Sequence, residues 1–199
     1  MISVWILVLL LAACSGPDTA SRTTGAVTPS AAATLTGAQL AADRFGGASF
    51  PSVQASTLEG DAVRVPEDLA GRPALLLIGY VQDAQFDLDR WLLGLLQAGT
   101  NVRCLELPTI SGWIPSLFAS RIDSGMRAGI PQEDWHTVAT LYGDDAGRVA
   151  DLTGKERGLN GRIMLLDAEG RIAWFHDRGY SASRLLELDA MVRQLESNR

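Results

Sequence analysis

The chain has 199 residues and carries a formal net charge of −6. This acidic balance excludes nucleic acid as a partner, because binding to phosphates requires clustered Lys and Arg side chains. Two cysteines in the whole chain exclude a fold that is held together by several disulfides.

The N-terminus has the pattern of an export signal. Residues 2–13 form an almost uninterrupted apolar run, and Cys14 follows directly. The run is shorter than the roughly 20 apolar residues of a membrane-spanning helix but suits the core of a secretory signal. Leu11-Ala12-Ala13-Cys14 resembles the lipobox of bacterial lipoproteins, in which the cysteine sulfur accepts lipid. We expect a signal peptide at 1–13 and attachment to a membrane through lipid on Cys14. In the enterobacterial sorting pattern, an Asp directly after the lipid-bearing Cys retains a lipoprotein in the inner membrane. Ser15 holds that position here, so the outer membrane facing the periplasm is favoured over the inner membrane.

Small and polar residues dominate the next segment, 14–44, which contains few large apolar side chains to bury. We expect a flexible tether there, which would hold a folded domain away from the lipid surface. The remaining segment, 45–199, has the length of one compact domain.

The first half of this domain alternates strands and helices. An N-terminal hairpin is expected at 53–65, with its turn at Glu59-Gly60-Asp61. The continuous apolar run at 73–80 predicts a central strand that is buried on both faces. The helix that follows has apolar residues at i, i+3, i+4 and i+7 and ends at Gly99. A second strand at 101–107 is closed by Pro108.

The second half adds another helix, a hairpin and a C-terminal helix. We expect, in chain order, a helix ending near Gly129, a strand at 136–142, a short helix at 146–152, hairpin strands at 162–166 and 171–176, and a final helix capped by Ser181. The fold class is therefore α/β, with a central mixed sheet flanked by helices and preceded by the hairpin.

This order of elements resembles the thioredoxin-like fold, and 162–174 looks like the final hairpin of that superfamily. Four further stretches are similar to the ATP10 family of mitochondrial ATP synthase assembly factors and its bacterial relatives: Phe50-Pro51, Ile78-Gly79-Tyr80, 121–131 and 138–144. The similarity covers most of the chain from Phe50 to Leu195. It implies a role in the assembly of a membrane complex.

The sulfur chemistry of thioredoxins is missing from the sequence. Thioredoxins place a Cys-x-x-Cys motif at the start of the helix after the central strand, where the helix lowers a thiol pKa. Val81-Gln82-Asp83-Ala84-Gln85 occupies that place here. Asn160-Gly161-Arg162 stands where thioredoxins carry a cis-proline. Cys104 falls in the middle of an expected strand, where a buried and unreactive thiol is the usual case.

No cofactor or metal is expected from the remaining motifs. The two histidines, His136 and His176, are not clustered with other ligands as a zinc site requires, and both are expected at the surface or in the hairpin. A Gly-rich phosphate loop is also missing.

Polar and aromatic residues mark a candidate surface for a protein partner in the cell envelope. Around the lost redox position these residues are Gln82, Asp83 and Gln85, with Phe86 and Asp89 beside them. A second group consists of Arg121, Arg127, Trp135 and His136, since exposed Trp and Arg often anchor interfaces. In the alternative interpretation, the two arginines belong to a solvated helix face.

Two functions remain open at this point. The first is a membrane-anchored, redox-inactive thioredoxin-like lipoprotein that acts as a binding or assembly module. The alternative is a thiol oxidoreductase or peroxiredoxin-like enzyme that uses Cys104.

Overall fold

The computed structural model describes residues 36–110, 112, 116–156 and 158–198. The expected signal peptide, Cys14 and most of the expected tether lie outside the described residues.

Seven strands form one mixed sheet in the order β2-β1-β5-β4-β3-β6-β7. Strands β3, β4 and β5 are mutually parallel, and the other neighbouring pairs are antiparallel. The expected N-terminal hairpin is confirmed as β1 and β2. The strands are β1 (Val53–Thr57), β2 (Ala62–Val65), β3 (Ala74–Gly79), β4 (Arg103–Ile110), β5 (Ala139–Tyr142), β6 (Arg162–Leu166) and β7 (Ile172–His176).

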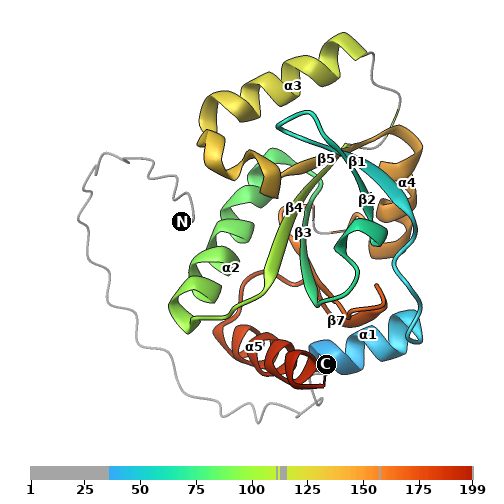
Figure 1. Cartoon of the computed structure of the whole chain (residues 1–199), viewed down its shortest axis with the longest axis vertical. Coiled ribbons are helices and arrows are strands. Elements are labelled where there is room, and N and C mark those ends of the chain that lie inside the picture. The colour runs from blue at the N-terminus through green and yellow to red at the C-terminus, as the bar shows by residue number, and fades with distance from the viewer. Residues whose placement is uncertain (1–35, 111, 113–115, 157, 199) are drawn as a thin grey trace, which may run out of the picture. The chain divides into compact units, whose positions relative to one another are not determined.

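Helices cover both faces of this sheet (Figure 1). The α-helices are α1 (Gly37–Phe45), α2 (Gln85–Ala98), α3 (Ser116–Gly129), α4 (Gly143–Thr153) and α5 (Ala182–Ser197). The 3-10 helices are η1 (Glu67–Leu69), η2 (Gln82–Ala84) and η3 (Gln132–Thr137). Residues of α2 and α5 share one apolar core, while residues of α1 and α4 share the core on the opposite face.

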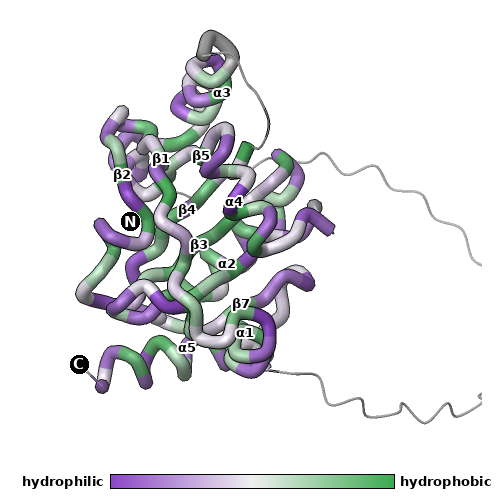
Figure 2. Tube along the Cα trace, turned by 90° about the vertical axis from the view of Figure 1, so that its right-hand side faces the viewer, coloured by the Kyte–Doolittle hydropathy of each residue, from purple (hydrophilic) through white to green (hydrophobic). Residues whose placement is uncertain are grey.

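The alternation of side chains along β3 divides these two cores. Leu75 and Leu77 point to the α2 side, and Leu76 and Ile78 point to the α4 side. All four are fully buried, which confirms the central strand expected from the apolar run. Figure 2 shows apolar residues in the central strands and hydrophilic residues on the outer sides of the helices.

Helix α1 lies within the segment expected to be a tether. Thr36 and Gln39 form a capping box at its start, and Phe45 makes an edge-to-face contact with Phe175 of β7, with ring centroids 5.2 Å apart. Gly37 is required for this packing, because a Cβ there would lie 2.0 Å from the Trp174 indole. The described part of the fold therefore includes Thr36 and the whole of α1, residues that the sequence analysis assigned mostly to the tether.

Three local expectations were wrong. Strand β4 continues through Pro108 to Ile110, because the proline sits where β4 stops pairing with β3 and begins to pair with β5. His136 lies in η3 rather than in a strand. Ser181 precedes α5, but its hydroxyl contacts the Ser183 hydroxyl at 3.0 Å instead of capping the helix.

Candidate functional site

The edge of the sheet where β3 ends and β6 begins corresponds to the redox position of thioredoxins. Chain segment Val81–Gln85 passes through η2 into α2 at this edge, and every residue of it except Ala84 is exposed. Gln82, Asp83 and Gln85 therefore lie together on one short exposed segment. No sulfur atom occurs in this segment.

Apolar side chains are also exposed at this edge. Val81 is 47% exposed, Phe86 at the start of α2 is 66% exposed, and Leu159 before β6 is 63% exposed. The segments that carry Val81 and Leu159 are neighbours, since a Cβ added at Gly158 would lie 3.7 Å from Val81 Cγ1; Phe86 follows Val81 in the chain at the start of α2. We call Val81, Phe86 and Leu159 the edge patch.

A buried carboxylate, Asp87, holds the edge in place from the first turn of α2. Its Oδ2 accepts a hydrogen bond from the Gly161 backbone N–H at 2.9 Å, and its Oδ1 accepts one from the Tyr180 N–H at 2.6 Å. These two donors belong to the loops before β6 and before α5. Asp87 thus ties three segments of the fold together at one point.

Arg162, the first residue of β6, fixes the other side of the same loop. Its side chain is completely buried and donates to the carbonyls of Asn160 at 2.7 Å and Gly154 at 2.8 Å, and also to that of Glu156. The guanidinium lies 5.1 Å from the centre of the Tyr80 ring. Arg162 lies where thioredoxins carry their cis-proline, and here it acts as an internal brace that holds the loop between Gly154 and Asn160 in place.

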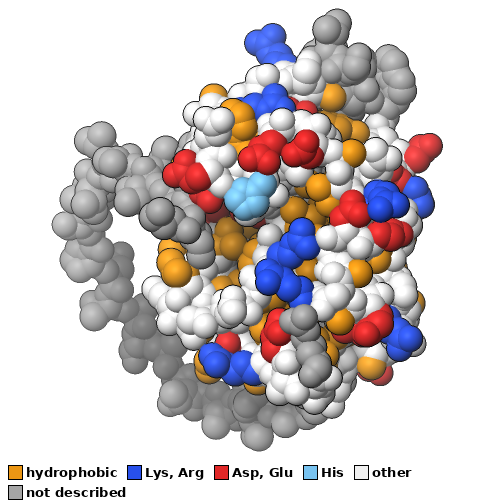
Figure 3. Space-filling view, viewed as in Figure 1, with side chains coloured by type: hydrophobic (Ala, Val, Ile, Leu, Met, Phe, Trp, Pro, Cys, Tyr) orange, Lys and Arg blue, Asp and Glu red, His pale blue; other side chains and the backbone are white. Residues whose placement is uncertain are grey.

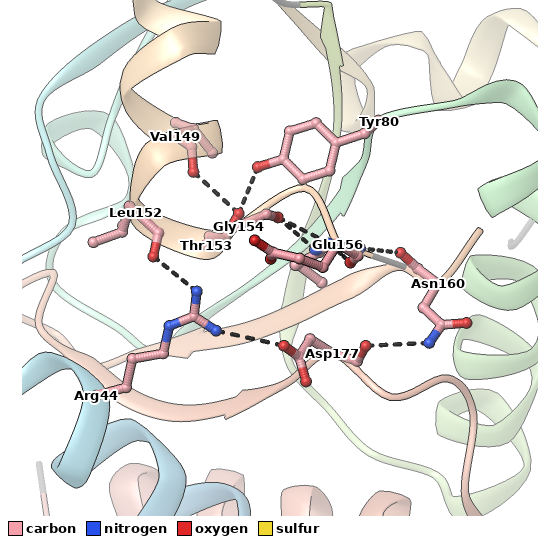
Figure 4. A network of polar contacts seen from close by, with 10 residues as sticks. Arg44, Tyr80, Val149, Leu152, Thr153, Gly154, Glu156, Asn160 and Asp177 are labelled. Atoms are coloured by element: carbon pink, nitrogen blue, oxygen red, sulfur yellow. Dashed lines mark hydrogen bonds and ion pairs between the residues drawn. The ribbon is translucent and has the colours of Figure 1, made fainter. Parts of the chain in front are cut away.

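The brace extends to α1 and β7 through further polar contacts in Figure 4. Arg44 of α1 donates to the Leu152 carbonyl at 3.2 Å and pairs with Asp177 at 3.4 Å. Asn160 Nδ2 donates to the Asp177 carbonyl at 3.2 Å. The loop under the edge patch is consequently held from three sides.

A group of polar and acidic side chains lies around Glu106 of β4. Gln85 Nε2 donates to Asp89 Oδ1 at 2.9 Å and to Glu106 Oε2 at 3.2 Å. Burial raises the pKa of the Glu106 carboxyl above its ordinary value of 4.5, and the negative charges of Asp89 and Asp134 raise it further. We call Gln85, Asp89, Glu106 and Asp134 the acidic junction.

The second predicted group lies on α3 and η3. Arg127 Nε donates to the Leu58 carbonyl at 2.6 Å and its guanidinium lies 5.8 Å from the centre of the Trp135 ring. The Trp135 indole N–H donates to the Ile130 carbonyl at 2.9 Å. These two side chains are half-buried, so they stabilise the turn between α3 and η3, whereas Arg121 and His136 are exposed.

Gln85 of the first predicted group and Asp134, which precedes Trp135 of the second group in the chain, both lie near Glu106. Figure 3 shows acidic side chains gathered around a histidine over η3, with hydrophobic side chains in the recess below. Arg121, on the solvent side of α3, has no described contact with either group.

The remaining thiol is poorly suited to redox chemistry. Cys104 is half-buried on β4, and its Sγ lies 3.7 Å from the Val102 carbonyl oxygen. Burial, together with the charge of Glu106, raises the pKa of the Cys104 thiol to about 12. The thiol stays protonated at neutral pH and is a weak nucleophile.

His176 was expected at the surface or in the hairpin, and it is a buried residue of the hairpin strand β7. It is 7% exposed, its Nε2 lies 2.8 Å from the Gly179 carbonyl oxygen, and its ring packs against those of Trp91 and Trp174. Burial lowers the pKa of its imidazole. Among the residues that the structure describes, no group of three His, Cys, Asp or Glu side chains is placed to hold a metal ion.

Sequence reasoning missed Asp87, Glu106 and Arg162. A signal was present for Asp87, since it lies four residues before Trp91 and so shares the buried face of α2. Arg162 binds backbone carbonyls of the loop directly before it, and Glu106 meets side chains of α2 and η3. No pattern in the sequence marks either set of contacts.

Neither a known protein family nor a curated protein matches the chain by sequence. Solved structures do resemble it. A SCO1/SenC family lipoprotein from Bacillus anthracis has a TM-score of 0.51 at 10% identity, covering 75% of this chain and 96% of that one. BsSco, a member of the Sco family of cytochrome c oxidase assembly proteins, has a TM-score of 0.52 at 10% identity, covering 76% and 95%. Copper-bound ScoI from Arabidopsis thaliana has a TM-score of 0.50 at 14% identity, covering 74% and 99%. These similarities confirm the thioredoxin-like fold.

Proposed function

We propose that this thioredoxin-like protein is a lipid-anchored binding or assembly module of the cell envelope that carries out no thiol redox chemistry. Its partner is another protein, which it contacts through the edge patch and the neighbouring polar residues Gln82, Asp83 and Gln85. The observation that carries the proposal is the composition of this edge. Apolar side chains are exposed where thioredoxins carry their reactive sulfur, and the buried Asp87 and Arg162 hold the underlying loops rigid.

A rigid, partly apolar surface is the kind that binds proteins with the least loss of conformational entropy. Exposed Phe86 and Leu159 would gain from burial in an interface, since each hides apolar area from water. Cys104 does not favour the alternative of an oxidoreductase, because its thiol is half-buried and its pKa is raised to about 12.

The envelope location rests on Cys14 and on the structural neighbours. The Bacillus anthracis protein of the same fold is itself a lipoprotein, and BsSco belongs to a family of assembly proteins. The similarity to the ATP10 family points to the same kind of role, assistance to a membrane complex. No helix within 36–110, 116–156 and 158–198 is long and apolar enough to cross a membrane.

Protein capture from solubilised membranes tests the binding proposal. The full chain is compared with a Phe86→Asp, Leu159→Asp double variant and with Leu186→Asp, a matched control on α5 whose leucine is 65% exposed. We expect one set of membrane-complex subunits to be enriched by the parent and by the control, and lost with the double variant. Equal recovery by all three chains, or no enriched subunit, would refute the proposal.

Membrane fractionation tests the anchor separately. Cys14→Ser removes the sulfur that would accept lipid. We expect this variant to leave the membrane fraction in which the parent is found and to lose metabolically incorporated palmitate. Cys104→Ser is the control and should fractionate like the parent. Palmitate that remains in the Cys14→Ser chain would contradict the assignment.

A further inference from the structure

Helix α2 carries a second apolar stripe, on the face opposite to its core. Its inner face buries Trp91 and Leu95, whereas its outer face exposes Phe86, Leu93 at 37% and Leu96 at 53%. We call Phe86, Leu93 and Leu96 the outer stripe. The first two are separated by seven residues, so they lie on nearly one line along the helix, roughly 10 Å apart. Exposed apolar side chains at this spacing are typical of a helix that packs along another helix.

Two side chains of opposite charge flank that line. Successive helix residues are about 100° apart, so Asp89 lies roughly 50° to one side of the line and Arg90 roughly 50° to the other. Neighbours on a helix do not face each other, so these two charges do not pair within one chain. Asp89 Oδ1 accepts a hydrogen bond from Gln85 of the acidic junction, and no ion pair among the described residues involves Asp89 or Arg90. Both charges are therefore available to a partner.

This arrangement is complementary to itself when two helices run parallel. A two-fold axis parallel to α2 brings the two outer stripes together and places Asp89 of each copy beside Arg90 of the other, at heights that differ by about 1.5 Å. An axis perpendicular to α2 brings the same flank of both helices together. Aspartate would then meet aspartate, and arginine would meet arginine, which is unfavourable. The charges therefore favour the parallel arrangement.

We propose that a second copy of this chain binds along α2, so that two chains form a parallel dimer through the outer stripe, with Asp89–Arg90 pairs on both sides of it. This inference goes beyond the proposed function, in which the partner is a different protein. The parallel arrangement places the start of α2 in both copies, and with it both edge patches, at the same end of the dimer. Phe86 belongs to both surfaces, whereas Leu93 belongs to the dimer alone.

The dimer is a weak one. The outer stripe offers three large side chains from a single helix, whereas a stable interface of standard size uses roughly 20–30 residues on each side. A weak dimer exchanges quickly and is best detected by covalent trapping at the contact, rather than by the mass of the isolated complex.

Disulfide trapping in the purified full chain tests the contact. Cys14→Ser and Cys104→Ser remove both natural thiols, so an introduced cysteine is the only one. Under mild oxidation we expect Phe86→Cys and Leu93→Cys each to form a homodimeric disulfide about tenfold faster than Leu186→Cys, a control on α5. Leu186 is more exposed than Leu93, so slower trapping there does not reflect poorer access. Rates no higher than the control would overturn the dimer.

A mixture of the Phe86→Cys and Leu93→Cys chains tests the orientation. In the parallel dimer each cysteine lies opposite its own copy, so we expect trapping within each kind of chain to be about tenfold faster than trapping between the two kinds. Faster trapping between the two kinds would overturn the parallel arrangement.

Charge reversal tests the assigned pairs in the Leu93→Cys chain. Asp89→Lys or Arg90→Glu alone places like charges side by side across the dimer, and trapping should fall to the rate of the control. The two changes together restore opposite charges and should recover the parent rate. Single variants that trap like the parent, or a loss that the double variant does not repair, would overturn the pairing.

Leu93→Asp separates this dimer from the proposed function, because it disrupts the outer stripe and leaves the edge patch intact. Trapping at Phe86→Cys should fall to the control rate, while protein capture by the Leu93→Asp chain should match the parent. A chain that is trapped as a dimer but captures no partner refutes the binding function alone. A chain that captures a partner but is not trapped refutes the dimer alone.

Discussion

Replacing Asp87 by alanine removes the carboxylate that joins α2 to the loops before β6 and before α5. Two backbone donors, the N–H groups of Gly161 and Tyr180, would lose their acceptor in a buried place. Hydrogen bonds to a charged group contribute about 1.5–3 kcal/mol each, so the free energy of unfolding should fall by about 3–6 kcal/mol. Asp87→Asn keeps one acceptor oxygen and should lose about half as much.

Guanidinium unfolding of the full chain, followed by tryptophan fluorescence, measures both losses. Asp83→Ala is the control, because Asp83 is an exposed aspartate on η2 and its removal should change the stability by no more than about 0.5 kcal/mol. A loss below about 1 kcal/mol for Asp87→Ala would refute the reasoning. The loops under the edge patch would then be held by other contacts.

Three further outcomes are expected. Burial lowers the pKa of His176 in the folded chain, so as the pH falls below 6.5 the unfolded chain takes up a proton before the folded chain does. The free energy of unfolding should therefore be constant above pH 6.5 and fall below it. Unfolding midpoints measured between pH 5 and 8 should lose this dependence in His176→Gln. Gly37→Ala forces a Cβ against Trp174 and should cost about 1–3 kcal/mol in thermal unfolding, whereas Gly147→Ala, in the open space of α4, should not destabilise. Finally, the pKa of the Cys104 thiol is about 12 in the folded chain against an ordinary 9.0, and only the thiolate reacts. Cys104 should therefore react with iodoacetamide at pH 8 about a thousandfold more slowly in the folded chain than in the unfolded chain. Equal rates would contradict the burial argument.

Elements with a strong pattern of their own could be predicted from the sequence. The apolar run of β3 and the spacing of Leu88, Trp91 and Leu95 in α2 encode burial directly, because each residue's environment follows from its neighbours in the chain. Helix α1 also had a local signal, the capping box of Thr36 and Gln39, but the small residues around it favoured a tether.

The candidate site could be located but not described in advance. Val81–Gln85 lie at the expected edge because the order of strands and helices alone places them there. What makes that edge rigid depends on contacts over long sequence separations: Asp87 with Gly161 and Tyr180, and Arg44 with Asp177. Such pairs have no periodicity, and one sequence by itself does not reveal them.

Helix α1 joins the start of the described chain to its C-terminal hairpin. Phe45, at the end of the helix, packs on Phe175, and Gly37, at its start, lies against Trp174. The segment after α1 is bonded to the same hairpin through Ala48 and Phe50, whose backbones join those of Ile172 and Gly170. Although α1 adds no strand to the seven-stranded sheet, its removal would expose buried aromatic surface of β7 to water.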